Sequence, residues 1–264
     1  MSDPEGPPYI LSARDKSAEF QRLDAMHDAI SHYFGGELGP APVTELAPRR
    51  ILDLGCGSGA WAIQAARQFP EAEVVAVDIT VLPDRELPGN MRFHQADLTE
   101  AFSVEPGAFN VVHARFVMSH LPNGKEMIGR AAQLVTPGGL LIIEDMDISS
   151  TAGTGGPAIF RVISHFIKFL RARGADAEIG SKLEAILNAQ SSLEDVNIMQ
   201  VTVPFAGNSS DSAKNALGVA MKMSAAGAIA AAHGLPTEIV QQYNEELDRC
   251  GCEVTIYFCW ARVS

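Results

Sequence analysis

One short segment, residues 51–61, constrains the fold of this chain more than any other. It reads Ile-Leu-Asp-Leu-Gly-Cys-Gly-Ser-Gly-Ala-Trp, so an apolar run enters a turn with glycines at three alternate positions, Gly55, Gly57 and Gly59. Such glycines let the backbone turn sharply off a strand and let a ligand approach the main chain closely. Asp53 lies at the end of the apolar run, where open α/β sheets bind ligands. The segment predicts a nucleoside-cofactor site.

Apolar segments alternate with helical patterns from residue 50 to residue 147, which is typical of parallel βαβ units. These segments are apolar throughout, as expected for strands that helices cover on both faces. No helix follows the last apolar segment, 253–263, so this strand need not be parallel. The predicted fold class is α/β, a Rossmann-like doubly wound sheet with added helices.

The glycine segment resembles the first motif of the class I S-adenosylmethionine-dependent methyltransferases. The N-terminal pattern around residues 9–36 and the triplet 113–115 resemble the fungal LaeA-like methyltransferases of secondary metabolism. The resemblance implies a mostly parallel sheet with an antiparallel last strand beside the fifth, and S-adenosylmethionine as the cofactor. Four further segments follow in the family's order: 74–78, 91–98, 109–115 and 134–142.

The resemblance also implies roles for single residues. The acid that ends the second strand, Asp78, accepts hydrogen bonds from the ribose hydroxyls in this family. The acid of the third motif, Asp97, holds the adenine amino group, and the next residue, Leu98, packs on the ring. The LaeA-like resemblance suggests that residues of an N-terminal helix close over the cofactor. The predicted cofactor-binding set is Tyr9, Arg22, His27, Asp53, Gly55, Cys56, Gly57, Gly59, Asp78, Ile79, Asp97, Leu98, Ala114 and Arg115.

Three residues near the ends of the fourth and fifth strands, His113, Arg115 and Glu144, are predicted to be catalytic. His113 and Arg115 stand where the family places groups beside the transferred methyl. Glu144 begins an acidic cluster with Asp145 and Asp147, which is either a solvated rim, a site for a substrate amine or a source of a base. Methyl transfer from a sulfonium needs alignment above all, and a neutral amine needs no fixed base.

The amino-acid composition of the chain argues against several classes of binding partner. The net charge is −12 with no Lys/Arg cluster, which argues against nucleic acid and against an anionic membrane surface. No apolar stretch reaches the length of a membrane span, and no secretory signal is visible, so we expect a cytoplasmic protein. Neither the four cysteines nor the acids and histidines show metal-ligand spacing, so no metal is predicted. The sequence does not indicate an oligomeric state.

The expected organisation is an N-terminal helical cap, residues 1–48, and a methyltransferase domain, residues 49–264, with lid insertions at about 150–195 and 208–250. The predicted function is methyl transfer to an O or N nucleophile of a small-molecule acceptor, a secondary metabolite by resemblance. A SAM-binding regulator of LaeA type, acting on or through a protein, is the alternative. An NAD-dependent oxidoreductase is a distant alternative, because Gly55-x-Gly57-x-x-Ala60 with Asp78 also satisfies a dinucleotide fingerprint.

Apolar side chains of the two lid insertions are predicted to enclose the acceptor. The candidates are Phe160, Phe166, Phe169, Met221, Met223 and Tyr243.

Overall fold

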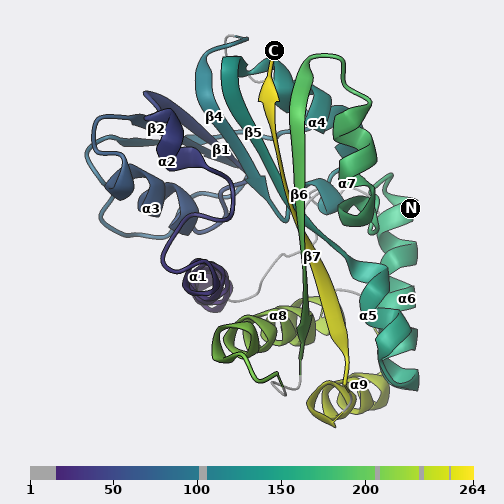
Figure 1. The fold of residues 1–264 in the computed structure, drawn as a ribbon. Helices are drawn as coiled ribbons and strands as arrows, with labels where there is room; N and C mark the ends of the chain where they lie inside the picture. Colours follow the sequence, from purple (N-terminus) through teal and green to yellow (C-terminus); the bar gives the residue numbers. More distant parts are fainter. Residues whose placement is uncertain (1–15, 101–105, 206–208, 232–234, 250) are drawn as a thin grey trace, which may run out of the picture.

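The structure is a computed structural model, and it describes residues 16–100, 106–205, 209–231, 235–249 and 251–264. In this part of the chain seven strands form one sheet in the order β3-β2-β1-β4-β5-β7-β6. Figure 1 shows the sheet with helices on both sides. The strands are β1 (Arg50–Leu54), β2 (Glu73–Asp78), β3 (Met91–Gln95), β4 (Phe109–Arg115), β5 (Val135–Asp147), β6 (Leu193–Pro204) and β7 (Glu253–Val263).

The first five strands pair in parallel, whereas β7 runs antiparallel to both β5 and β6. The last strand therefore lies beside the fifth, and the predicted fold class is confirmed. The helices are α1 (Lys16–Tyr33), α2 (Val43–Leu46), α3 (Ala60–Gln68), α4 (Gly124–Gln133), α5 (Ile148–Thr154), α6 (Pro157–Ala172), α7 (Ile179–Asn188), α8 (Ser212–Ala231) and α9 (Thr237–Arg249), with a 3₁₀ turn η1 (Met118–His120).

Helices cover both faces of the sheet because each carries an apolar stripe. On α4, Met127, Ile128, Ala131 and Ala132 are buried at helical spacing, and they pack with α7 on one face. On the other face α3 buries Trp61 and a run of alanines against β1, β2 and β4. The central strands are buried on both sides, which explains why they read as continuous apolar runs.

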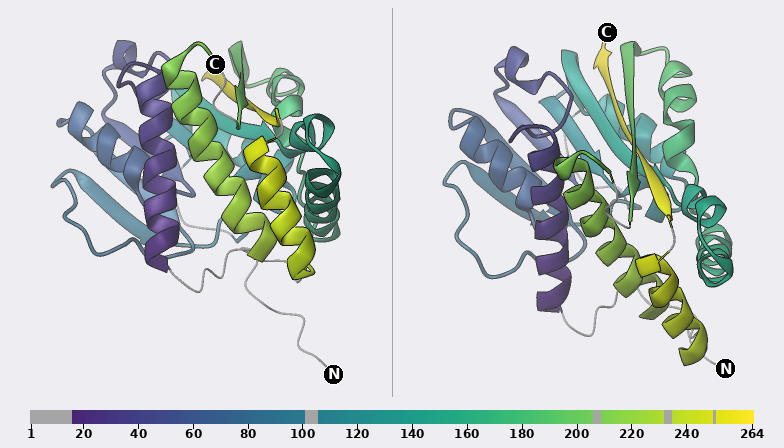
Figure 2. Two further views of the ribbon diagram at one scale, coloured as in Figure 1. Left: turned by 90° about the horizontal axis from the view of Figure 1, so that it is seen from below. Right: turned by 60° about the horizontal axis from the view of Figure 1, so that its bottom comes forward.

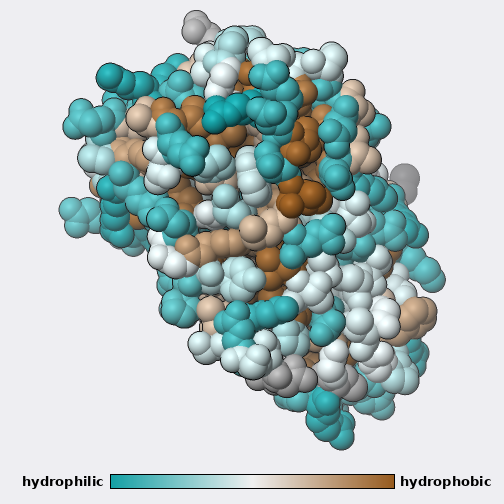
Figure 3. All heavy atoms as spheres, in the orientation of Figure 1, coloured by the Kyte–Doolittle hydropathy of each residue, from teal (hydrophilic) through white to brown (hydrophobic). Residues whose placement is uncertain are grey.

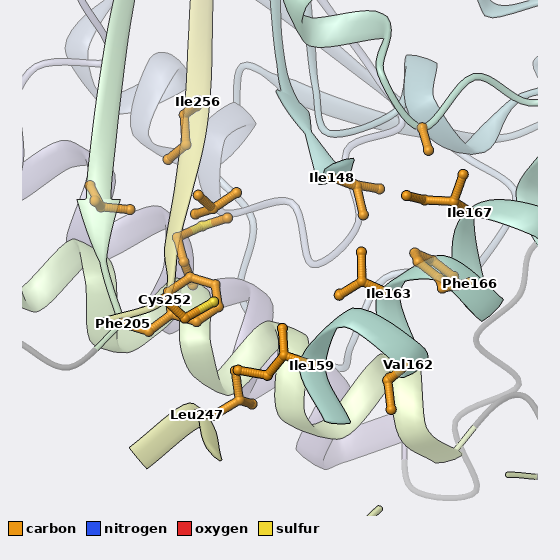
Figure 4. Packing of buried hydrophobic residues seen from close by; sticks show 14 of the residues in the cluster. Ile148, Ile159, Val162, Ile163, Phe166, Ile167, Phe205, Leu247, Cys252 and Ile256 are labelled. Atoms are coloured by element: carbon orange, nitrogen blue, oxygen red, sulfur yellow. The ribbon is translucent and has the colours of Figure 1, made fainter. Parts of the chain in front are cut away.

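A second core lies below the parallel part of the sheet. Strands β5, β6 and β7 are 13, 12 and 11 residues long and extend beyond their neighbours, and α5, α6, α8 and α9 pack around the extension (Figure 1). Seen from below, α1, α8 and α9 lie side by side across this end (Figure 2). Figure 4 shows Ile163 and Phe166 of α6 facing Ile148 of α5 within this core.

One helix forms where the amino-acid composition is typical of a loop. Residues 149–156 are rich in Ser, Thr and Gly and read as a loop, but α5 occupies residues 148–154. Asp147 caps this helix, since its Oδ1 accepts hydrogen bonds from the Ser149 backbone N–H at 2.9 Å and from the Ser149 hydroxyl. The Asp147 cap and the burial of Ile148 and Thr151 together outweigh the weak helix propensity of the sequence.

The expected cap and lid segments contain most of the helices outside the βαβ units. Residues 1–48 hold α1 and α2, residues 150–195 hold most of α5 and all of α6 and α7, and residues 208–250 hold α8 and α9. In the orientation of Figure 3, hydrophobic side chains gather toward the middle of the face, over the sheet, and hydrophilic side chains surround them. Among the described helices, none is long and apolar enough to cross a membrane.

Candidate active site

A cavity of about 190 Å³ lies at the carboxyl ends of the parallel strands, beneath α1 and α8. Its two parts differ in chemistry. The cofactor end follows β1, β2 and β3 and is lined by Gly55, Gly57, Asp78, Ile79, Asp97 and Leu98. The apolar chamber is lined by Met26, Met146, Ile148, Ile163, Phe166, Phe205, Met221 and Val254, which come from α1, the end of β5, α5, α6, the end of β6, α8 and β7.

The glycine turn is built from backbone that other residues rarely adopt. Gly55, Gly57 and Gly59 all have positive φ, at 68°, 57° and 81°. The Gly55 and Cys56 N–H groups donate to the Val77 carbonyl at 2.8 and 3.0 Å, which ties the turn to β2. A Cβ at Gly55 would collide with the Val117 side chain. Glycine is therefore required here both by φ and by the close approach of the turn after β4.

Asp78 closes the turn from the second strand. Its Oδ2 accepts a hydrogen bond from the Gly57 N–H and its Oδ1 accepts one from the Thr80 N–H, both at 2.8 Å. Burial raises the pKa of Asp78, and these two hydrogen bonds oppose the rise. A carboxylate that is partly desolvated at a cavity wall keeps lone pairs for a ligand that donates, such as a pair of ribose hydroxyls.

Asp97 stands at the same end, where its Oδ1 accepts from the backbone N–H and the hydroxyl of Thr99 at 2.8 and 2.7 Å. Ile79 and the buried Leu98 supply apolar surface between the two acids. Two carboxylates that flank apolar side chains, beside a turn with exposed main chain, fit a nucleoside with hydroxyl and amino donors.

A chain of buried charges lies behind the cavity, on the sheet face under α3. Asp53 Oδ1 and His113 Nδ1 are 2.8 Å apart, and His113 Nε2 lies 3.7 Å from Glu144 Oε2. The His113 ring stacks on Trp61, with centroids 3.8 Å apart and planes 5° from parallel. Burial opposes the charged form, but the hydrogen bond to Asp53 and the charge of Glu144 raise the pKa of His113 overall. His113 thus lies between two carboxylates that favour its protonated form.

Arg115 continues this chain toward α1. Its Nε donates to Glu144 Oε2 in a short contact, and its Nη2 donates to the Leu38 carbonyl at 2.7 Å. Burial favours the neutral acid, but the charges of Arg115 and His113 lower the pKa of Glu144 to about 2. His27 Nδ1 lies 3.2 Å from Arg115 Nη1, and burial together with Arg115 lowers the pKa of His27 to about 4. The Glu144 carboxylate is therefore paired with the Arg115 guanidinium.

The charged chain of Asp53, His113, Glu144 and Arg115 holds the turn after β4 in a strained conformation. Phe116 has φ of +56°, which is rare for an aromatic residue, and its N–H donates to the Glu144 carbonyl at 2.8 Å. Phe116 and Val117 both line the cavity. Glu144 therefore fixes the turn twice, through its carbonyl to Phe116 and through its carboxylate to Arg115.

The structure brings together many, but not all, of the predicted site residues. Tyr9 lies outside the described residues. His113, Glu144, Asp53 and His27 are buried and belong to the charged chain behind the cavity rather than to its lining. Cys56, Gly59 and Ala114 are also outside the lining; burial raises the pKa of the Cys56 thiol. The predicted residues that do line the cavity are Arg22, Gly55, Gly57, Asp78, Ile79, Asp97, Leu98 and Arg115.

Most residues of the apolar chamber were missed from the sequence. Of the six predicted side chains only Phe166 and Met221 line it. Phe160 and Met223 point outward and are 57% and 56% exposed, because they sit on the outer faces of α6 and α8. His120, which is not among the predicted site residues, also lines the cavity. Only helical phase could have separated Met221 from Met223, and a helix rich in small residues gives little phase signal.

Comparison with known proteins decides the family. A family profile described as a methyltransferase domain matches residues 24–188. The chain belongs to the methyltransferase family. Methyltransferase str3 of Strobilurus tenacellus is 42% identical over 207 residues, which cover 77% of this chain and 73% of that protein. The secondary metabolism regulator laeA of Coprinopsis cinerea is 34% identical over 145 residues, covering 53% of this methyltransferase and 36% of the regulator.

The fold is shared with solved methyltransferase structures. Phosphoethanolamine N-methyltransferase 2 of Haemonchus contortus, in complex with S-adenosylmethionine, superposes with a TM-score of 0.53 at 16% identity, over 96% of this chain and 61% of that one. The predicted resemblance and cofactor are confirmed: this chain is a methyltransferase that uses S-adenosylmethionine. The dinucleotide alternative is set aside. Among the described residues no cluster of three His, Cys, Asp or Glu side chains could hold a metal ion.

Proposed function

We propose that this methyltransferase transfers a methyl group to a small, largely apolar acceptor bound in the apolar chamber. The observation that carries the proposal is the continuity of the cavity. One wall is built from the glycine turn and the acids of the cofactor end, and the other from aliphatic, Met and Phe side chains. A chamber lined by such side chains gains affinity from apolar area and supplies few partners for a polar ligand.

The residues of the cofactor end position the donor. Bound S-adenosylmethionine supplies a methyl group already activated as a sulfonium, so alignment is the main demand on the protein. Asp78 and Asp97, which line this end, would accept hydrogen bonds from the nucleoside, and the glycine turn would hold the rest of the cofactor along its main chain. Phe116 and Val117 stand where the cofactor end meets the apolar chamber and exclude water from the path of transfer.

We propose positioning roles for His113 and Glu144 in place of the contact with the acceptor expected from sequence. Both side chains are 1% exposed, and Asp53, Trp61 and Arg115 surround them. Their charges fix Arg115 and the strained turn at Phe116, which lines the cavity. Arg115 itself belongs to the cavity lining, while its guanidinium is held by Glu144 and the Leu38 carbonyl.

The remaining parts of the proposal concern the setting. Residues 1–48 act as a cap and the segments 150–195 and 208–250 as lids, since α1, α6 and α8 line the cavity. We propose a metal-independent reaction, a cytoplasmic location and an acceptor from secondary metabolism. The metabolic setting draws support from the laeA relative, which is a regulator of secondary metabolism. An enzyme is favoured over a regulator because the regulator matches only about half of this chain.

The test is turnover with trideuteromethyl S-adenosylmethionine and mass spectrometry. The acceptor panel holds apolar phenols, anilines and aromatic acids beside amino acids and sugars of similar size, with and without EDTA. We expect label in the apolar set, unchanged by EDTA. Label in amino acids or sugars alone would contradict the apolar acceptor. Label that appears only in protein bands of a host extract would favour the regulator, and activity that EDTA removes and magnesium restores would contradict metal independence.

A further inference from the structure

His120 is the ionisable side chain of the cavity that neither the sequence nor the charged chain accounts for. It ends η1, directly after the strained turn at Phe116, and lines the cavity. Its own N–H donates to the Val117 carbonyl at 3.0 Å, and the Ser119 N–H donates to Asp145 Oδ2 at 3.0 Å. The turn is therefore closed by its own backbone and fixed to β5. The His120 ring lies 6.5 Å, centre to centre, from that of Phe166 in the apolar chamber.

The other titratable groups of the described lining cannot take a proton from a molecule in the chamber. They are Arg22, Asp78, Asp97 and Arg115. Arginine stays protonated in proteins and only donates. Asp78 and Asp97 stand at the cofactor end, where Asp78 accepts from two backbone N–H groups and Asp97 accepts from the N–H and the hydroxyl of Thr99. Among the described residues that line the cavity, His120 is thus the one placed to accept a proton from an acceptor in the chamber.

Burial and the charge of Arg22 keep the His120 ring neutral. Glu19, which holds the Arg22 guanidinium through two hydrogen bonds of 2.8 and 2.6 Å, acts in the opposite sense. Burial first, and then the charge of Arg22, lower the pKa of His120 to about 4. At neutral pH the ring therefore keeps a nitrogen lone pair.

We propose that His120 is the catalytic base of the methyl transfer and that the acceptor nucleophile is a hydroxyl group. The proposal rests on the function proposed above. The new bond joins the acceptor oxygen to the methyl carbon as the carbon–sulfur bond breaks, and the electron pair of that bond stays on sulfur. The hydroxyl proton passes to a ring nitrogen of His120, which later releases it to water. An amine can lose its proton after transfer without such a base, whereas a hydroxyl has to be relieved of it during the step.

The experiment compares two acceptors that differ in their need for a base. Phenol is protonated in mildly alkaline buffer, since its pKa is about 10 like that of tyrosine, whereas 4-nitrophenol is largely ionised there. His120→Asn keeps a polar group of similar size but cannot accept the proton. We expect this variant to methylate phenol about 100-fold or more slowly while its rate with 4-nitrophenol stays within about threefold of wild type. The matched control is His32→Asn, at an exposed position of α1 away from the cavity.

The outcomes separate the two proposals. Equal losses with phenol and 4-nitrophenol would overturn the base assignment and make His120 a structural residue. Affinity for S-adenosylmethionine, measured by calorimetry, should be unchanged in the variant; a parallel loss of cofactor binding also contradicts the assignment. Wild-type turnover of anilines with none of either phenol overturns the hydroxyl acceptor and leaves the apolar chamber standing. Absence of turnover with every apolar compound overturns the proposed function itself.

Discussion

The two ends of the cavity are built in different ways. The cofactor end comes from turns that directly follow β1, β2 and β3, and its acids and glycines are fixed by hydrogen bonds to nearby backbone. The apolar chamber comes from side chains of seven elements, from Met26 to Val254, that meet only after the chain has folded. The first end is therefore specified locally, and the second depends on packing across the whole chain.

This difference predicts that substitutions at the two ends affect different ligands. Changes at the cofactor end should weaken S-adenosylmethionine binding and leave acceptor use intact. Changes in the chamber should do the reverse. Three substitutions test this separation of ligands, and one change of pH compares the stability of the two regions. They are ordered from the largest expected effect to the smallest.

Gly57→Val should abolish detectable binding of S-adenosylmethionine, a loss of more than about 100-fold, while the protein stays folded. A valine would have to adopt φ of +57°, and its Cβ would lie 3.0 Å from Leu23 Cδ1. Gly35→Val is the matched control, because Gly35 also has positive φ, at 69°, but nothing lies within 4 Å of its Cβ position. Calorimetry gives affinity and thermal unfolding gives stability. If both variants bind the cofactor equally well, the turn is not part of the site.

Acidification should destabilise the protein through one histidine from each region, His27 of the charged chain and His120 of the chamber. Both have pKa values lowered from 6.5 to about 4, so the unfolded chain binds more protons between these values and stability falls as pH falls from 6.5 to 4. Asp145 opposes this, because burial raises its pKa to about 6. These three groups alone predict a loss of roughly 3 kcal/mol, which the raised pKa values of Asp78 and His113 reduce.

Urea unfolding at pH 6.5 and pH 4.5 measures this loss. His27→Asn and His120→Asn should each flatten the pH dependence, and the exposed His32→Asn should not. A stability that is constant over this range in wild type contradicts the assignment of neutral histidines. Flattening in only one variant would show that acid acts on one region alone.

What could be predicted from the sequence differs between the cofactor end and the apolar chamber in the same way. Gly55, Gly57, Asp78 and Asp97 could be identified because each is adjacent in sequence to the strand that positions it. Arg115 was found for the same reason. The sequence could not show that His113 and Glu144 turn toward Asp53 and Arg115, away from the cavity, since this depends on which sheet face each residue occupies and on the register of β1, β4 and β5.

The side chains that line the apolar chamber could not be predicted from the sequence for a further reason. Its walls come from helices whose inner faces are fixed only by their partners, so Met221 faces inward while Met223, two positions on, is exposed. Phe205 and Val254 reach the chamber because β6 and β7 extend past the parallel strands. The 3₁₀ turn that brings His120 to the cavity wall has no strong sequence signature either.

Asp78→Ala should weaken S-adenosylmethionine binding by about 1.5–3 kcal/mol, through loss of charge-assisted hydrogen bonds to the ligand and of the bond from the Gly57 N–H. The acceptor KM at saturating cofactor should stay unchanged. Asp84→Ala, at an exposed position of the loop between β2 and β3, is the control. Calorimetry and steady-state kinetics measure the two quantities. A rise in acceptor KM equal to the loss of cofactor affinity would show that the two ends are not separable at this residue.

The smallest effect is expected in the chamber and uses two methionines of α8. Met221 is 2% exposed and lines the chamber, whereas Met223 is 56% exposed on the outer face of the same helix. Met221→Ala should raise the KM of an apolar acceptor about 5–10-fold, as expected for the loss of roughly 1 kcal/mol of apolar contact. Met223→Ala should leave it unchanged, and neither should alter cofactor affinity. Because Met221 also packs in the lower core, thermal unfolding has to show that the variant is folded at the assay temperature. Equal KM values for the two variants would place the acceptor elsewhere, and a matching loss of S-adenosylmethionine affinity in Met221→Ala would mean that α8 serves both ends of the cavity.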